Sequence, residues 1–525
     1  MNRQFTKQLL LGFVLTLSTI GLSSLPCLAS TSPEQPASQH QLSANVPLNS
    51  YVYDYLEKLD GLGYLQEMRV GAKPYTRMQV AKWVQQLAVN MDLRPDVPPY
   101  AQTMLSELQK TFHQELTTLE GSPQQNVISL KEWTLGETYY KGNTMSHQGT
   151  TSTYQPLNIN QNGYRYAPHA NEVLSLRLEG NVNNHFVISA SPHISYDNRD
   201  HTSSSLESAY VKTKLNNVDI QFGKDAMWWG QGSRGSLLLT NNATPQTALK
   251  ITNIDPMKPS GFFKFLGPTN ASFFYSILEN NRTDVRYPSL VGFRGDFTPT
   301  SNFTFGAART SIVGGEGHML HKSDYWKFMT GHNAETANGD QWNSIAGGDF
   351  RWRIPKWSGL QLYGELYGED QAHAFSIIPI PSKVASLVGI YIPRLSTNGD
   401  WDAHVEIAHT TTPWYKHSLY TNGYTYEGDI MGDAMGNNAK RYYTKLTHFT
   451  TNGTQLALNL ERVTQQYSNT YPQTIDSLWL SMRTKMEQDM FINAAFGVAN
   501  IKNVGYTGGN KEHSYIMSVS LNKEY

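Results

Sequence analysis

Three carboxylates stand close together in the segment after residue 360. Glu365, Glu369 and Asp370 suggest a glycosidase, because two carboxylates about 5–9 Å apart can cleave a glycosidic bond. On a β-strand, however, Glu365 and Glu369 would share one face about 13 Å apart, which is too far for the usual pair. We expect them to balance nearby cations, and we keep all three as candidate polysaccharide contacts. The expected cations are Arg351, Arg353 and Lys356.

A second group of residues suits sugar recognition. Trp228 and Trp229 stand beside glycines, and an indole ring can stack on the C–H face of a sugar. Arg234 follows a glycine-rich stretch and could bind the carboxylate of an acidic polysaccharide through its planar fork. Structural roles compete with these. The indoles could fill the interior or anchor at a membrane interface, and Arg234 could pair internally with Asp225 or Glu365.

No further catalytic or metal-binding motif stands out in the sequence. The 16 histidines show no HExxH-type spacing, and no G-x-S-x-G turn marks a nucleophilic serine. The single cysteine, Cys27, lies in a segment that we expect to be removed. We therefore predict no cofactor, no metal and no enzymatic activity. The sequence leaves open a hydrolase in which a serine and a histidine come together only in the folded protein.

The elements that must hold these residues are β-strands. From about residue 127 to the end, apolar and polar residues alternate with a period of two, as in 172–179 and 455–461. The polar positions include charges in mid-strand, such as Arg177 and Glu461. The last strand ends in an aromatic residue, Tyr525, which is typical of outer-membrane barrels. This pattern favours a barrel with a polar interior over a sandwich.

Length and composition agree with a membrane barrel. A chain of 525 residues exceeds one ordinary soluble core, which stops growing at about 250–300 residues. Charged residues make up only 16% and aromatic residues 12%, which suits a lipid-facing wall with aromatic girdles. The roughly 400 residues after 126 would supply about 16–18 strands. A net charge of -1 argues against nucleic acid as a partner.

The first 125 residues divide into three predicted parts. Residues 1–29 have the charged start, apolar run and small residues of a cleavable signal peptide. Residues 30–46 are polar and aperiodic, which predicts a flexible leader. Residues 47–125 show helical periodicity, with three predicted helices and a capping box that begins at Thr76. We expect this helical region to pack on or occlude the periplasmic side of a barrel formed by residues 126–525.

The middle of the chain carries several short phrases in order. Residues 227–232 read MWWGQG, and residues 235–245 read GSLLLTNNATP. Later phrases are GGEG at 314–317, AGGDFRWR at 346–353 and MGDAMG at 431–436. Together they resemble the capsule-assembly (Wzi) family of outer-membrane proteins. Gln231 and the pair Ser233-Arg234 depart from the residues that this resemblance leads us to expect.

The resemblance implies a fold and a role. It implies an all-β membrane barrel of 18 antiparallel strands in the cell outer membrane, occluded by helical elements. It also implies a part in holding or organising capsular polysaccharide at the cell surface, without established catalytic residues. We expect a monomer whose partners are surface polysaccharide and outer-membrane lipid. A porin-like channel for sugars or small solutes, and an outer-membrane enzyme that modifies glycan or lipid, are the alternatives.

Overall fold

The computed structural model describes most of the chain. The described residues are 40–66, 71–122, 124, 127–182, 185–197, 201–321, 324, 328, 341–374, 378–486 and 489–525, with the backbone alone at 370–374 and 378–382. The predicted signal peptide and the predicted leader up to residue 39 lie outside these residues. None of the described helices is long and apolar enough to cross a bilayer.

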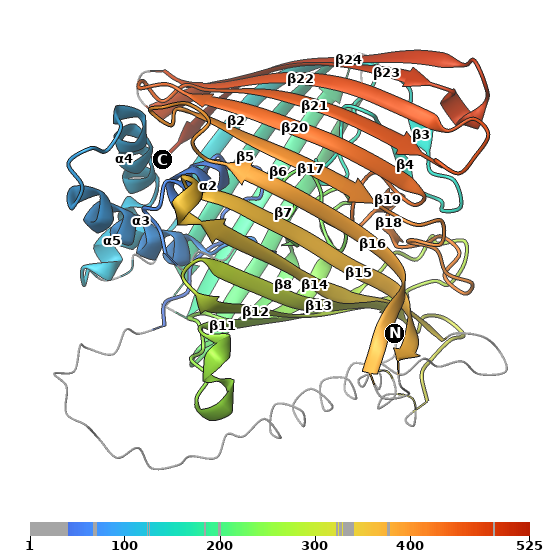
Figure 1. Cartoon of the computed structure of the whole chain (residues 1–525), viewed down its shortest axis with the longest axis horizontal. Coiled ribbons are helices and arrows are strands. Elements are labelled where there is room, and N and C mark those ends of the chain that lie inside the picture. The colour runs from blue at the N-terminus through green and yellow to red at the C-terminus, as the bar shows by residue number, and fades with distance from the viewer. Residues whose placement is uncertain are drawn as a thin grey trace. The chain divides into compact units, whose positions relative to one another are not determined.

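Eighteen antiparallel strands in the described part of the chain form one closed barrel (Figure 1). Strands that follow one another along the wall pair in order, and the seam closes where the first barrel strand pairs with the last. The predicted barrel of about 18 strands is therefore confirmed. The barrel strands are β2 (Ile128–Lys141), β5 (His169–Val182), β6 (Phe186–Asp197), β7 (Thr202–Leu215), β8 (Val218–Lys224), β10 (Thr247–Asn253), β11 (Thr269–Ile277), β12 (Ser289–Thr300), β13 (Phe303–Val313), β14 (Trp342–Ile354), β15 (Leu360–Ala374), β16 (Ile378–Ile392), β17 (Trp401–His409), β20 (Ala439–Phe449), β21 (Gln455–Gln465), β22 (Gln473–Lys485), β23 (Met490–Lys502) and β24 (Lys511–Glu524).

The wall of the barrel is apolar outside and polar inside. On β21, Leu456 and Leu460 are exposed on the outer face, whereas the Glu461 side chain is buried in an ion pair. Arg177 and Arg483 also lie inside, where each pairs with glutamate carboxylates. Lipid offers no hydrogen bonds, so a sheet can cross a membrane only when it closes on itself. The alternation and the closure together place lipid around this wall.

The two ends of the barrel differ in the length of their connections. At one end, residues 216–217 and 301–302 form two-residue turns. At the other end, residues 142–168, 225–246 and 410–438 form long connections. Outer-membrane barrels have short turns in the periplasm and longer loops outside the cell. We therefore assign the end with the short turns to the periplasm.

The N-terminal helices cover the periplasmic end, as predicted (Figure 1). Thr76 caps α3 by accepting a hydrogen bond from Gln79 N at 3.2 Å, as a capping box requires. The single third helix that the sequence predicts is instead two, because the buried Phe112 leaves helical geometry between them. The helices share a hydrophobic core with Phe449 of the barrel. Their bounds are α2 (Val52–Gly61), α3 (Arg77–Asp92), α4 (Pro99–Thr111) and α5 (His113–Leu119).

Residues 41–46 are packed against the barrel, which differs from the flexible leader expected for 30–46. Leu42 is buried, and Asn45 Nδ2 donates to Gln221 Oε1 on the inner face of β8 at 2.9 Å. The polar composition indicates disorder for the segment as a whole. Its last residues nevertheless alternate between apolar and polar. The apolar ones are buried, and the polar Asn45 forms hydrogen bonds with the barrel.

Short strand pairs belong to the loops rather than to the wall. The pair β1–β9 joins the segment before α3 to the long connection after β8, so chain from both ends meets inside the barrel. These strands are β1 (Ala72–Lys73), β9 (Trp228–Trp229), β3 (Met145–Ser146), β4 (Thr153–Tyr154), β18 (Thr425–Tyr426) and β19 (Asp429–Ile430). The 3₁₀ helices are η1 (Gly261–Leu266), η2 (Pro355–Trp357) and η4 (Val504–Tyr506).

Candidate functional site in the lumen and loops

The loop of residues 225–246 enters the lumen and carries the first of the sequence phrases. Trp228 and Trp229 are only 8% and 2% exposed, and as β9 they pair with β1. The Trp229 ring packs edge-to-face on Phe274 of β11, with a centroid distance of 5.1 Å. In this arrangement both indoles fill the lumen. Their predicted contact with polysaccharide stays a prediction.

Glu365 on β15 fastens this loop to the wall. Its Oε1 accepts hydrogen bonds from Gln231 N at 2.7 Å and Gly232 N at 2.8 Å. Its Oε2 accepts from Leu237 N at 2.9 Å and Ser236 Oγ at 3.1 Å. A buried carboxylate is costly unless hydrogen bonds replace its water. Here the loop supplies four donors, so the carboxylate and the loop hold each other in place.

A glycine makes this close approach possible. A Cβ at Gly230 would collide with Ser236 Oγ and with Glu365 Oε1. The φ of Gly230 is 145°, which residues with a side chain rarely adopt. The tight packing of this loop on the Glu365 carboxylate thus explains the glycine of the MWWGQG motif.

Arg234 pairs with Glu461 of β21 across the lumen. Its Nε and Nη2 lie 3.0 Å and 2.9 Å from the two carboxylate oxygens, which is a bidentate geometry. The predicted internal salt bridge exists, but both predicted partners are wrong. Asp225 accepts a hydrogen bond from Asn45 Nδ2 instead, and Glu365 is saturated by backbone and hydroxyl donors.

A second arginine extends this network to another loop. Arg441 on β20 donates to Asp433 Oδ1 at 2.5 Å and to Glu406 Oε1 at 2.8 Å. The other oxygen of Glu406 accepts from Ser233 N at 2.8 Å. Asp433 belongs to the connection 410–438, so two long loops meet in one buried ion network. Sequence reasoning missed these residues, and its only signal was the MGDAMG phrase around Asp433.

Glu369 does not form a catalytic pair with Glu365. Glu369 is 2% exposed, and its Oε1 accepts a hydrogen bond from Tyr415 N at 2.6 Å. The side chain of Asp370 lies outside the described residues. Because Glu365 and Glu369 are both buried and both bind loop backbone, their geometry is that of anchors.

The cations expected to balance the acids of β15 bind the N-terminal helix instead. Arg351 lies 2.7 Å from Glu57 of α2, and Arg353 lies 3.0 Å from Asp60. Burial alone would raise the pKa of Glu57, but His404 and Arg351 beside it hold that pKa well below its usual range. These ion pairs fix α2 to the barrel. The third expected cation, Lys356, is exposed at the periplasmic rim.

His147 joins two of the extracellular connections, 142–168 and 410–438. Its Nε2 donates to Ala434 O at 3.0 Å, and its Nδ1 accepts from Ser152 Oγ at 3.0 Å. Burial lowers the pKa of His147 to about 4. The ring is therefore neutral at neutral pH, which matches one donating and one accepting nitrogen.

Two Ser–His contacts in the described part of the chain bear on the pair that the sequence leaves open, and neither has a hydrolase geometry. In Ser152–His147, the other ring nitrogen binds a backbone carbonyl rather than an acid. Ser175 Oγ lies 2.9 Å from His193 Nδ1, and Glu207 Oε1 lies 3.3 Å from the same nitrogen. A hydrolytic triad needs its serine and its acid on opposite ring nitrogens. Within the described ranges, no group of three or more His, Cys, Asp or Glu side chains could hold a metal ion.

One surface at the extracellular end is open to an external ligand. It is formed by residues 466–472 and 503–510, and we call it the loop surface. Tyr471 is 53% exposed, and its ring lies over Gly508, where a Cβ would be 2.7 Å from a ring carbon. The sequence analysis did not identify this surface. The only sign of it in the sequence is its turn-forming residues. Around Tyr471 the exposed residues carry hydroxyls, amides or no side chain: Ser468, Asn469, Thr470, Thr507, Gly509 and Asn510.

The sequence also matches a known family. The model of the capsule assembly protein Wzi family matches residues 138–514. The chain belongs to this family. The family predicted from the ordered phrases is thereby confirmed. The departure at Gln231 is accommodated in this member, because its Nε2 donates to Asp349 Oδ1 at 2.7 Å.

Individual relatives agree with this family. An uncharacterized 55.8 kDa protein of the cps region of Klebsiella pneumoniae is 30% identical over 167 residues, which are 31% of this chain and about a third of that relative (33%). Among solved structures, Escherichia coli Wzi has a TM-score of 0.68 at 18% identity, covering 92% of this chain and 100% of that chain. That protein is described as a carbohydrate-binding β-barrel of the outer membrane that is involved in group 1 capsule assembly. OprD from Pseudomonas aeruginosa has a TM-score of 0.45 at 9% identity, covering 77% of this chain and 96% of that chain.

Proposed function

We propose that this Wzi-family protein is a non-catalytic outer-membrane protein that binds surface polysaccharide and promotes the attachment of capsule to the cell. The family match over residues 138–514 carries this proposal. The role described for the E. coli relative, carbohydrate binding in capsule assembly, is the role that we transfer. The apolar outer wall supports the outer membrane as its location, where we expect a monomer surrounded by lipid.

We place the polysaccharide on the loop surface. One face of the Tyr471 ring is covered by Gly508, and the exposed remainder can stack on a sugar ring. Hydroxyl and amide side chains around it can exchange hydrogen bonds with sugar hydroxyls. A polymer could repeat such weak contacts along its length, so that their combined strength exceeds that of one contact.

In this proposal, the residues of the sequence motifs support the loops and do not themselves contact the polysaccharide. Glu365, Glu369 and Arg234 hold loops in the lumen, and Trp228 and Trp229 pack that interior. These contacts give two extracellular connections a fixed base, because Arg234 of 225–246 and Asp433 of 410–438 belong to the same ion network and Glu369 also binds the backbone of 410–438. A rigid base lowers the entropy lost when a loop surface binds its ligand.

The proposal is tested in a strain that lacks the gene, by imaging capsule and measuring cell-bound against released polymer. We expect more released polymer, restored by the native protein and restored poorly by Tyr471→Ala. Tyr442→Ala is the matched control, because Tyr442 is 51% exposed but lies on the wall strand β20. Unchanged retention of polymer in the deletion strain would refute the attachment role. Equal restoration by both variants would refute the loop surface as the binding site.

A further inference from the structure

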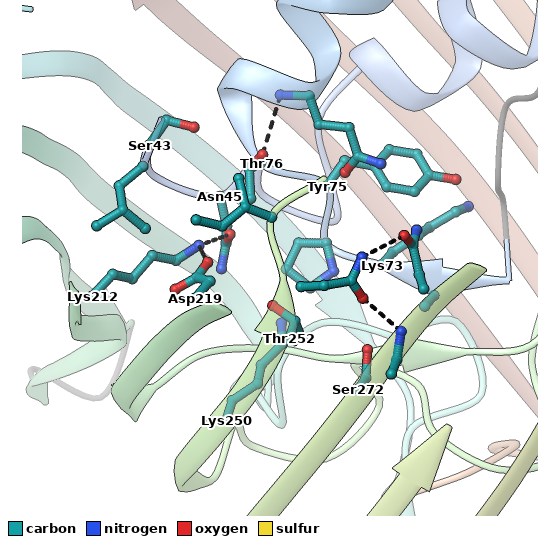
Figure 2. Close-up of a pocket in the computed structure, with 18 of the residues that line it drawn as sticks. Ser43, Asn45, Lys73, Tyr75, Thr76, Lys212, Asp219, Lys250, Thr252 and Ser272 are labelled. Carbon is teal, nitrogen blue, oxygen red and sulfur yellow. Dashed lines mark hydrogen bonds and ion pairs between the residues drawn. The ribbon is translucent and has the colours of Figure 1, made fainter. Parts of the chain in front are cut away.

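A cavity at the periplasmic end of the lumen lies outside the site described above. It is enclosed by residues 41–45, by the segment 72–79 and by the inner faces of β7, β8, β10, β11 and β12. Figure 2 shows Lys212, Asp219 and Asn45 on one side of it, with Lys250, Thr252 and Ser272 on the strands below. Its lining includes the end of β10, which leads into the periplasmic rim.

The cavity is lined by three lysines and two aspartates, and the aspartates are already engaged. Lys212 Nζ lies 2.9 Å from Asp219 Oδ2 and 2.6 Å from Asn45 Oδ1. Asp296 is bound by Arg294, whose Nη2 donates to its Oδ1 at 2.6 Å. The charges of both aspartates are therefore balanced within the protein. Of the other two lysines, Lys73 interacts electrostatically with Glu57, which leaves Lys250 to make the cavity positive.

Lys250 has no hydrogen-bond or ion-pair partner in the described part of the chain. Asp225, which accepts from Asn45 and Gln221, acts on it only at longer range. The side-chain hydroxyls of Thr252 and Ser272 also lack partners there, and these two residues face each other across β10 and β11. All three side chains are half-buried, so solvent reaches them. An ammonium that is partly withdrawn from water and has no paired carboxylate attracts an anion more strongly than an exposed ammonium does.

Lys73 approaches the same cavity from β1. Its ammonium lies 5.1 Å from the Tyr53 ring centroid and 5.9 Å from that of Trp228. Rings stabilise an ammonium from one side and leave its other protons free to donate. The Lys73 ammonium lies against rings that do not line the cavity, and it interacts electrostatically with Glu57. An anion in the cavity would meet the ammonium group of Lys250 and the hydroxyls of Thr252 and Ser272.

We propose that this cavity is a second ligand site, which binds the carboxylate and adjacent hydroxyls of an acidic sugar from the periplasmic side. The carboxylate takes the place of the missing counter-ion of Lys250, and the sugar hydroxyls exchange hydrogen bonds with Thr252 and Ser272. The polar lining suits a hydroxylated anion better than an acyl chain. The site lies at the opposite end of the barrel from the loop surface, so it does not depend on the function proposed above.

The test is isothermal titration calorimetry of the detergent-solubilised, full-length mature protein with D-glucuronate, D-glucose and inorganic phosphate. We expect glucuronate to bind and glucose not to bind. Lys250→Met should weaken glucuronate binding by at least about tenfold, the usual effect of losing a charged hydrogen-bond partner. Lys264→Met is the matched control, because Lys264 is exposed on η1, and it should bind like the native protein.

Three outcomes would overturn the proposal. Native affinity for glucuronate in Lys250→Met would exclude this lysine as the anion contact. Glucose binding as tightly as glucuronate would exclude a charged ligand. Phosphate binding more tightly than glucuronate, with the same loss in Lys250→Met, would assign the cavity to a phosphate group instead of a sugar acid.

Unchanged heat-modifiable migration on gels would show that each variant is folded. Thr252→Val gives an independent check, with an expected loss of a few-fold.

Discussion

Replacing Glu365 by glutamine should release the loop of residues 225–246 from the lumen. The carboxylate accepts four hydrogen bonds from this loop, two at each oxygen. Glutamine keeps one accepting oxygen and turns an NH₂ group toward the other two donors. A buried donor left without an acceptor costs about 1–3 kcal/mol, so leaving two should destabilise the docked loop by about 2–6 kcal/mol. The salt bridge of Arg234 would oppose release, so we expect a dynamic loop rather than an empty lumen.

The assay is single-channel conductance in planar bilayers. The native protein should conduct little, because β1 pairs with β9 in the lumen and the N-terminal helices cover the periplasmic end. Glu365→Gln should show frequent openings and faster proteolysis within residues 225–246. Glu172→Gln is the control, because the same substitution is made at an exposed residue of β5, away from the loop. Conductance and proteolysis equal to those of the native protein would refute the anchoring role of Glu365. A wide conductance in the native protein would favour the porin-like alternative.

Three further predictions concern the loops and the ion network. Burial lowers the pKa of His147 to about 4, so the folded state favours the neutral ring. The contribution of this residue to the free energy of unfolding should be full above about pH 6.5 and should fall by up to about 3 kcal/mol as the pH drops toward 4. Urea unfolding in lipid vesicles across this pH range measures the loss, which His147→Gln should abolish. Arg234→Met and Glu461→Gln should each cost up to about 3 kcal/mol, because each removes one half of a bidentate pair, with the 3.9 Å contact to Arg441 Nε left for Glu461. The double variant should cost little more than either single one. Additive losses in that double-mutant cycle would contradict a direct pair. Gly230→Ala should destabilise the protein by about 1–3 kcal/mol through its clash with Ser236 and Glu365, and native unfolding curves would count against this packing.

Local patterns predicted most of the fold because a strand's inward and outward faces alternate over a few residues. The runs 172–179 and 455–461 lie within β5 and β21, and the Thr76 cap begins α3 as expected. The end of the leader and the break at Phe112 were not predicted. Both depend on burial against residues that are distant in the sequence, which a local pattern does not encode.

The candidate site was predicted less well for the same physical reason. Arg234 was expected to pair with an acid inside the lumen, but its partner Glu461 lies 227 residues away. The composition of a strand predicts that a carboxylate faces inward. Which arginine it meets depends on how the barrel closes and where each long loop folds back. The same dependence concealed the cavity beside Lys250, whose walls come from eight separate segments of the chain.

The pairing of β2 with β24 has a consequence for how this protein is made. The seam places Glu132 opposite Glu524, so the ring closes only when β24 has been inserted beside β2. Until then, the two outermost strands present unpaired amides and carbonyls, which hydrocarbon cannot solvate and which invite pairing with other chains. Contacts between such distant residues also form slowly. Biogenesis must therefore shield both strands until they meet, and a chain without β24 would form an open sheet rather than a slightly smaller barrel.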